Sequence, residues 1–325
     1  MQTPELLSDP AYHDEDAARA YIETIRWPTG PVCQHCGSVE KIRPLGGPSM
    51  GPGWYYCGAC KNKFTVRMGS VFERSHIPLH KWLLAIRLMA SSKKGISANQ
   101  LHRTLGITLK SAWFLGHRIR EAMADNSPAP LGGEGVVIEA DETFIGREGS
   151  HDPTSWVYTN DKGWVRSDGK MKVMTLVERG GKARSIHVDR LTSLGVYIVL
   201  HNHADPASEL NTDEAPYYRR AGRAFKKHEA VNHAREEWAR GSVTTNTVEG
   251  FFSIFKRGMK GVYQHCGEKH LQRYLAEFDF RYSNRKALGI EDTERAAITI
   301  KGAEGKRLTY RRTRRPAKAN ARTVA

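Results

Sequence analysis

The chain has 325 residues, of which 39% are hydrophobic, and its formal net charge is +15. This hydrophobic content suffices for packed cores and argues against a wholly disordered chain. The positive charge indicates a polyanionic partner, most commonly nucleic acid, although a basic protein without such a partner is the alternative. No segment approaches the ~20 apolar residues of a membrane span. The acidic N-terminus lacks the features of a secretory signal, so we expect a cytoplasmic protein with no membrane partner.

The N-terminal part of the sequence is typical of helices around a cysteine-rich segment. An amphipathic helix is predicted over 14–27, with acidic residues in its first turn. Further helices are predicted over 78–92, 97–105 and 108–123, with a break at Gly106. The stretch NSPAPLGGEG at 126–135 is rich in helix breakers and marks a domain boundary.

Four of the five cysteines form two CxxC pairs, Cys33 with Cys36 and Cys57 with Cys60. Each pair lets two thiolates converge on one ion, and four thiolates complete a closed tetrahedron. The spacing predicts one structural Zn²⁺ in a zinc ribbon. With no open coordination position, this zinc would hold a fold and would not catalyse.

The two helices around Gly106 are arranged as in a helix-turn-helix motif, whose second helix enters the major groove of DNA. Lys110, Ser111, Arg118 and Arg120 of the second helix would then be available to DNA. Any helical hairpin with basic residues gives a similar pattern, so an ordinary hairpin remains the alternative.

After the boundary the pattern changes to strands, predicted over 136–144, 171–181 and 182–190, followed by a helix over 192–203 and a short strand over 208–214. Helices are predicted again over 246–260 and 268–286. This order indicates an α/β or α+β domain with a mixed sheet and flanking helices. Residues 147–170 read as an inserted loop, and the basic tail from 301 is predicted to be disordered without a partner.

Acidic residues lie near the ends of two of the predicted strands. Glu139 and Asp141 share one strand face and Glu142 points to the other, which makes Asp141 the favoured metal ligand, Glu139 a possible assistant and Glu142 a bystander. Asp213 and Glu214 close the later strand. Acids at strand ends are often merely solvated, but their recurrence favours a site.

The predicted helix 246–260 has an apolar arc and an opposite polar arc. Its polar residues are Asn246, Glu249, Ser253, Lys256, Arg257 and Lys260, and the cations could lie along a phosphate backbone. Carboxylates from several elements bind Mg²⁺ or Mn²⁺. Two such ions can assist in-line displacement at phosphorus.

Together these motifs resemble the zinc-ribbon DDE transposases of bacterial insertion sequences, in the ISXO-like group named after insertion sequence fifteen-ninety-five. The resemblance covers residues 14–286 and rests on CxxC…CxxC, IEADETFIG, LNTDE, TNTVEGFFSIFKRGMKGVYQH and HLQRYLAEFDFRYSNRK. It implies a ribonuclease-H-like catalytic domain with two Mg²⁺ or Mn²⁺ ions. Asp141 and Asp213 match the two aspartates and Glu249 the third acid, with Asn246 as an alternative or additional member and Lys256 as the following basic residue.

The resemblance implies cleavage at the terminal inverted repeats of an insertion sequence and transfer of the 3′-hydroxyl into target DNA, without a covalent enzyme intermediate. Tyr217, Tyr218 and Tyr263 are therefore interpreted as packing residues or DNA contacts. We expect a homo-oligomer that associates with the bacterial nucleoid. The alternatives are a DNA-binding regulator without catalysis and a ribonuclease on the same fold.

We predict five parts of the chain from these patterns. They are an N-terminal helix over 1–27, the zinc ribbon over 28–75, a helical DNA-binding domain over 76–125, the catalytic domain over 134–290 and a basic tail over 291–325.

Overall fold

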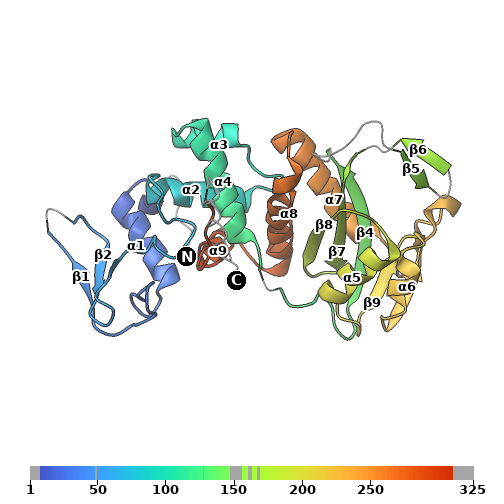
Figure 1. The fold of residues 1–325 in the computed structure, drawn as a ribbon, viewed down its shortest axis with the longest axis horizontal. Helices are drawn as coiled ribbons and strands as arrows, with labels where there is room; N and C mark the ends of the chain where they lie inside the picture. The colour runs from blue at the N-terminus through green and yellow to red at the C-terminus, as the bar shows by residue number, and fades with distance from the viewer. Residues whose placement is uncertain are drawn as a thin grey trace, which may run out of the picture.

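The computed structural model describes residues 8–47, 50–126, 128–146, 156–159, 163–166 and 169–309. It is elongated, with a helical part that carries the N-terminal ribbon at one end and a sheet domain at the other (Figure 1). The parts adjoin where α4 (Leu109–Met123) packs beside α8 (Glu268–Ser283). No described helix combines the length and the apolar composition that crossing a membrane requires.

The ribbon is a small antiparallel sheet of β1 (Ile42–Leu45), β2 (Trp54–Cys57) and β3 (Lys63–Phe64). It follows α1 (Glu15–Arg26), whose N-cap Asp14 accepts a hydrogen bond from the Ala17 amide. Cys33, Cys57 and Phe64 are buried in the same hydrophobic core as the neighbouring helices. The ribbon and the helical region therefore share one core.

The predicted helical hairpin is formed by α3 (Ala98–Leu105) and α4. Ser97 and Gln100 make a reciprocal capping box at the start of α3. Gly106 ends the helix with φ +59°, a left-handed conformation that favours glycine. Together with α2 (Leu79–Ser91), these elements confirm the predicted helices of this region.

A helix that we did not predict completes the helical core. Residues 292–301, which we assigned to the disordered tail 291–325, form α9 (Asp292–Lys301) and pack against α2. Arg295 is 7% exposed and donates to the carbonyl oxygens of Ala90, Asn284 and Ile290. The tail prediction was wrong for this segment because its few apolar residues, Ala296 and Ile300, are buried in the shared core. Residues 310–325 lie outside the described residues.

The second domain is built on a five-stranded mixed sheet in the order β10-β9-β4-β7-β8. β4 (Val137–Ile145) pairs antiparallel with β7 (Met171–Glu178), which pairs antiparallel with β8 (Ala183–Val188). On its other edge, β4 pairs in parallel with β9 (Glu209–Thr212), and β9 with β10 (Lys227–Ala230). The sheet confirms the predicted mixed α/β domain and adds β10.

Helices cover both faces of this sheet. Because side chains alternate between the two faces along a strand, successive residues pack against different helices. Val173 and Val177 of β7 pack with α7 (Asn246–Gly258) and α8, whereas Met174 and Leu176 pack with α5 (Ser193–His203) and α6 (Tyr218–Gly222). The five-residue α6 was not predicted.

The predicted inserted loop 147–170 contains a hairpin of β5 (Trp156–Thr159) and β6 (Gly163–Arg166). Most of its other residues lie outside the described residues. A second short hairpin, β11 (Ala239–Arg240) with β12 (Val243–Thr244), immediately precedes α7.

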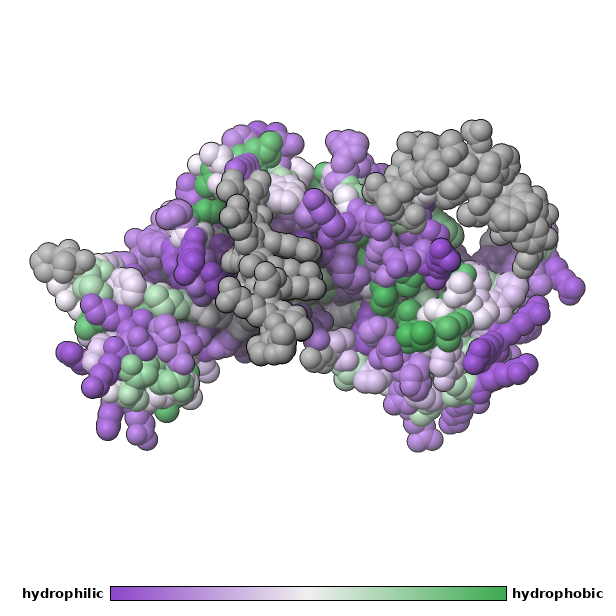
Figure 2. Space-filling view, in the orientation of Figure 1, coloured by the Kyte–Doolittle hydropathy of each residue, from purple (hydrophilic) through white to green (hydrophobic). Residues whose placement is uncertain are grey.

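Hydrophilic residues dominate the surface seen in Figure 2. An apolar patch lies over α5, where Leu194 and Ile198 are 57% and 48% exposed. The helix is apolar on several sides up to Leu200, and its Val196 and Leu200 supply the side that is buried against the sheet.

Candidate active site and metal centres

The carboxylates of the predicted site converge because β4 and β9 are parallel neighbours. Glu139 is paired with Asn211 in the register of these strands, so Asp141 and Asp213 come side by side two residues further on. Asp213 follows the last residue of β9, and its Oδ1 accepts from the Ala215 amide at 3.0 Å. The structure thus brings together the two aspartates predicted from separate strands.

A third carboxylate belongs to this group, and it is Glu142. One ligand atom from each of Asp141, Glu142 and Asp213 lies within 4.8 Å of the others. Glu142 does point to the opposite strand face, toward α6, where Tyr217 donates to its Oε2 at 2.8 Å and Tyr218 donates to its Oε1. Glu142 therefore points to the other strand face, as predicted, but its carboxylate lies beside both aspartates.

The electrostatics of this group indicate a shortage of positive charge. Burial raises the pKa of Asp141 to about 6, and the charges of Asp213 and Glu249 act in the same direction, against a hydrogen bond from the Glu142 amide. Burial also raises the pKa of Glu142 to about 8, despite the hydrogen bonds from Tyr218 and Tyr217. Among the described Lys and Arg residues, none forms an ion pair with these three carboxylates.

Glu249 lies near the group on the first turn of α7, without belonging to it. Its Oε1 accepts from the Thr245 hydroxyl at 2.8 Å and lies 3.9 Å from His233 Nε2. Its negative charge is one of the smaller contributions that raise the pKa of Asp141. Asn246 is the exposed first residue of the same helix, so α7 presents both predicted third members.

Glu139 has a different task from the one that we predicted. It is fully buried, and its Oε1 accepts from Arg179 Nε at 2.7 Å and from the Thr247 hydroxyl at 2.9 Å. Its Oε2 accepts from the backbone amides of Thr247 and Val248 at 2.7 and 3.1 Å. Glu139 therefore caps the N-terminus of α7 from the neighbouring strand and positions the helix that carries Glu249.

His233 is a residue of this site that the sequence did not reveal. Its backbone amide donates to Glu214 Oε2 at 3.0 Å, and its Nε2 lies 3.4 Å from the Thr245 hydroxyl. The ring packs edge-on against Trp238, which is 59% exposed. A single histidine in a polar segment carries no sequence signal, because its position depends on how the segment folds back onto β9 and α7.

The four ribbon cysteines form a separate cluster in the N-terminal part. Their sulfur atoms lie within 4.8 Å of one another, with Cys33 3.6 Å from Cys60 and Cys36 3.7 Å from Cys57. Tetrahedral zinc with Zn–S bonds of about 2.3 Å would separate its sulfur ligands by about 3.8 Å. The cluster therefore fits a structural Zn²⁺.

Two protein-family models match the chain, one over the segment with the cysteine cluster and one over the segment with the acidic group. Residues 13–63 match the model of the transposase zinc-ribbon domain, and residues 130–283 match that of the ISXO2-like transposase domain. Together the two models span more than half of the chain. The chain belongs to the ISXO2-like transposases.

A relative supports the same relationship along most of the transposase. An uncharacterized protein in transposable element ISH50, from Halobacterium salinarum, is 27% identical over 277 residues. The similarity covers 82% of this chain and 90% of the relative. The matched transposase domain identifies the chain as a DDE-type enzyme, and the DDE family generally uses Mg²⁺.

The predicted DNA-binding residues of the transposase divide into exposed and buried sets. Lys256, Arg257 and Lys260 are exposed at and after the end of α7, and Lys110 is exposed at the start of α4. Ser111 is half-buried, and its amide donates to the Thr108 hydroxyl as part of the α4 N-cap.

The two arginines that we expected to contact DNA from α4 are buried instead. Arg118 is 5% exposed, donates to the Glu73 carbonyl oxygen and lies over the Trp82 ring. Arg120 is 4% exposed, and its Nε donates to Glu277 of α8 at 2.6 Å. The prediction failed because these positions of α4 face the core and the second domain.

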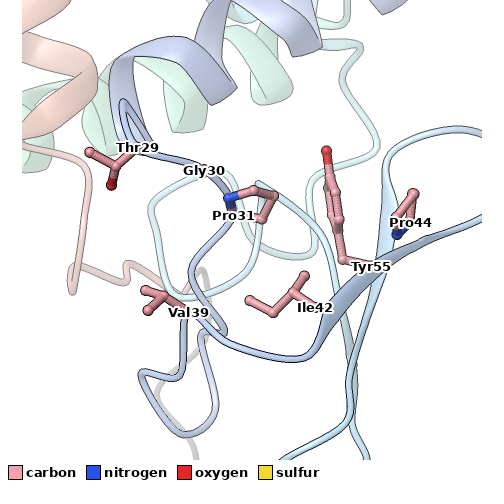
Figure 3. A pocket seen from close by; sticks show the side chains of 7 residues that line it. All are labelled: Thr29, Gly30, Pro31, Val39, Ile42, Pro44 and Tyr55. Atoms are coloured by element: carbon pink, nitrogen blue, oxygen red, sulfur yellow. The ribbon is translucent and has the colours of Figure 1, made fainter.

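A separate pocket of about 260 Å³ lies in the ribbon of the transposase (Figure 3). Its walls include Val39 and Ile42 and the ring of Tyr55, whose hydroxyl donates to Glu23 at 3.1 Å. None of the acidic site residues lines it, so it is not part of the active site.

Proposed function

We propose that this transposase binds the terminal inverted repeats of an insertion sequence and catalyses metal-dependent strand cleavage and strand transfer into target DNA. The observation that carries the proposal is the convergence of Asp141 and Asp213 from adjacent parallel strands, with Glu249 on the helix beside them. Such an oxygen-only donor set suits Mg²⁺ or Mn²⁺, and the raised pKa of Asp141 reflects a place where a cation is favourable.

In this proposal, Asp141, Asp213 and Glu249 hold two divalent ions, with Asn246 as an alternative or additional member. The bound ions would supply electrophilic assistance for displacement at phosphorus. Thr245 orients the Glu249 carboxylate through its hydroxyl, and Glu139 holds α7 against the sheet. The four cysteines hold one structural Zn²⁺.

DNA contacts are proposed for two surfaces. Lys256, Arg257 and Lys260 extend from the end of α7, and cations in such a row suit a phosphate backbone. Lys110 and Ser111 lie in the first turn of α4, the part of a helix-turn-helix that reaches the major groove. We propose that α3 and α4 act in this way, and that the transposase acts on both element ends as a homo-oligomer.

The test is cleavage of double-stranded DNA that carries the terminal repeat, with Mg²⁺, by the wild type and by Asp141→Ala. The proposal predicts that Asp141→Ala binds the ends but does not cut them. A wild type that binds and never cuts would instead be a DNA-binding regulator. Cleavage confined to the RNA strand of a hybrid would identify a ribonuclease.

A further inference from the structure

Glu142 occupies an unusual place for a residue without an assigned role. It follows Asp141 directly on β4, yet its carboxylate comes within 4.8 Å of both Asp141 and Asp213. Asp141 lies within β4 and Asp213 directly follows β9, and Glu142 approaches them from the face of the sheet that α6 covers. The three carboxylates are therefore close enough to share one cation.

Two tyrosines hold Glu142 in this position. Tyr217 donates to Oε2 at 2.8 Å, and Tyr218, which is only 1% exposed, donates to Oε1. Each carboxylate oxygen has two lone pairs, so each keeps one for a further partner after the tyrosine bond. The tyrosines thus fix the orientation of the carboxylate and leave it able to bind a cation.

Glu142 also differs from two fully buried glutamates of this protein. Glu139 and Glu277 are both fully buried, and each pairs with an arginine: Arg179 at 2.7 Å and Arg120 at 2.6 Å. A buried carboxylate needs such a partner to offset the loss of hydration. Among the described residues, Glu142 has only neutral hydroxyl donors, and its nearest ionisable neighbours include two further acids.

We propose that Glu142 is a ligand of a divalent cation that it shares with Asp141 and Asp213. This inference rests on the proposed function and adds a fourth acid to its metal site. The carboxylates of Asp141, Glu142 and Asp213 would hold a hard divalent cation, which prefers oxygen ligands. Tyr217 and Tyr218 are positioning residues, because they orient the ligand without touching the ion.

The first experiment measures Mn²⁺ binding to the full-length, zinc-loaded protein by electron paramagnetic resonance titration, without DNA. Glu142→Gln keeps the shape of the side chain and is expected to weaken Mn²⁺ binding by tenfold or more. Glu214→Gln is the matched control: Glu214 adjoins Asp213 but accepts from the backbone amides of His233 and Ala234, so its Mn²⁺ affinity should stay near that of the wild type.

The second experiment distinguishes a ligand from a residue that only positions its neighbours. In Glu142→Cys loaded with Mn²⁺, X-ray absorption at the manganese edge should detect a sulfur ligand that the wild type lacks. The zinc cluster does not contribute at this edge. Manganese surrounded only by oxygen in a Cys variant that binds it as tightly as the wild type would overturn the proposal.

The outcomes separate this inference from the proposed function. Unchanged Mn²⁺ affinity in Glu142→Gln, together with loss of binding in Asp141→Asn, would reject Glu142 as a ligand and leave the proposed site intact. Absence of Mn²⁺ binding in the wild type would reject both. The denaturation midpoint of Glu142→Gln serves as the folding check, and the Cys variant supplies an independent readout.

Discussion

Glu139 caps the N-terminus of α7, and replacing it should lower the free energy of unfolding by an amount that the structure lets us estimate. Glu139→Gln keeps the size of the side chain but removes its charge from four hydrogen bonds, donated by Arg179, by the Thr247 hydroxyl and by the Thr247 and Val248 amides. Breaking a buried ion pair costs about 3–5 kcal/mol. Because the Arg179 side chain is 27% exposed and can regain some hydration, we expect a loss at the lower end, about 3 kcal/mol.

Urea denaturation of the catalytic domain, followed by intrinsic fluorescence, measures this free energy of unfolding. Cleavage should fall as well, because α7 carries Glu249 and its first turn loses its anchor on β4. The control is Glu134→Gln, whose side chain is 88% exposed and which should change stability by less than about 0.5 kcal/mol. A loss below about 1 kcal/mol in Glu139→Gln, with full cleavage, would refute the assigned role of the cap.

Three further expectations concern zinc, pH and the buried arginine. Removing Zn²⁺ should destabilise the whole helical part along with the ribbon, because Cys33 and Cys57 share its core; calorimetry that shows ribbon melting alone would contradict this. Burial raises the pKa of Asp141 to about 6 and that of Glu142 to about 8, and carboxylic acids must lose their protons to bind metal. Mn²⁺ affinity should therefore rise between pH 6 and 8, and an affinity that does not change over this range would contradict the expectation. Arg118→Gln should lower the melting temperature without changing the salt dependence of DNA binding, because Arg118 is buried. A reduced salt dependence would instead show that Arg118 contacts DNA.

The sequence was most informative where chemistry is local. The CxxC spacing predicts the cysteine cluster because each pair forms within one tight turn. Asp141 and Asp213 could be predicted because each is an acid in or next to a predicted strand, and neighbouring strands of one sheet bring such residues together, although Asp141 lies within β4 and not at its end. These predictions needed no knowledge of how distant helices pack.

The remaining roles depend on tertiary contacts that have no local signal. Strand alternation correctly predicts that Glu142 points to the other face of β4. The sequence did not predict α6, however, and Tyr217 and Tyr218 at its start determine where the Glu142 carboxylate lies. In the sequence, Arg118 and Arg120 cannot be distinguished from exposed basic residues of a surface helix. Their burial depends on how α4 packs against its neighbours. Glu139 likewise becomes a helix cap only when α7 is placed beside β4.

The most direct test of the account follows strand transfer with a pre-cleaved terminal repeat in Mg²⁺, using ends that carry a 3′-hydroxyl or a dideoxy terminus. The wild type should join only the 3′-hydroxyl end to target DNA. Asp213→Asn should fail both to join this end and to cleave an intact one, while still binding DNA. If Asp213→Asn cleaved or joined DNA at the wild-type rate, the central claim that these carboxylates form the catalytic site would be contradicted.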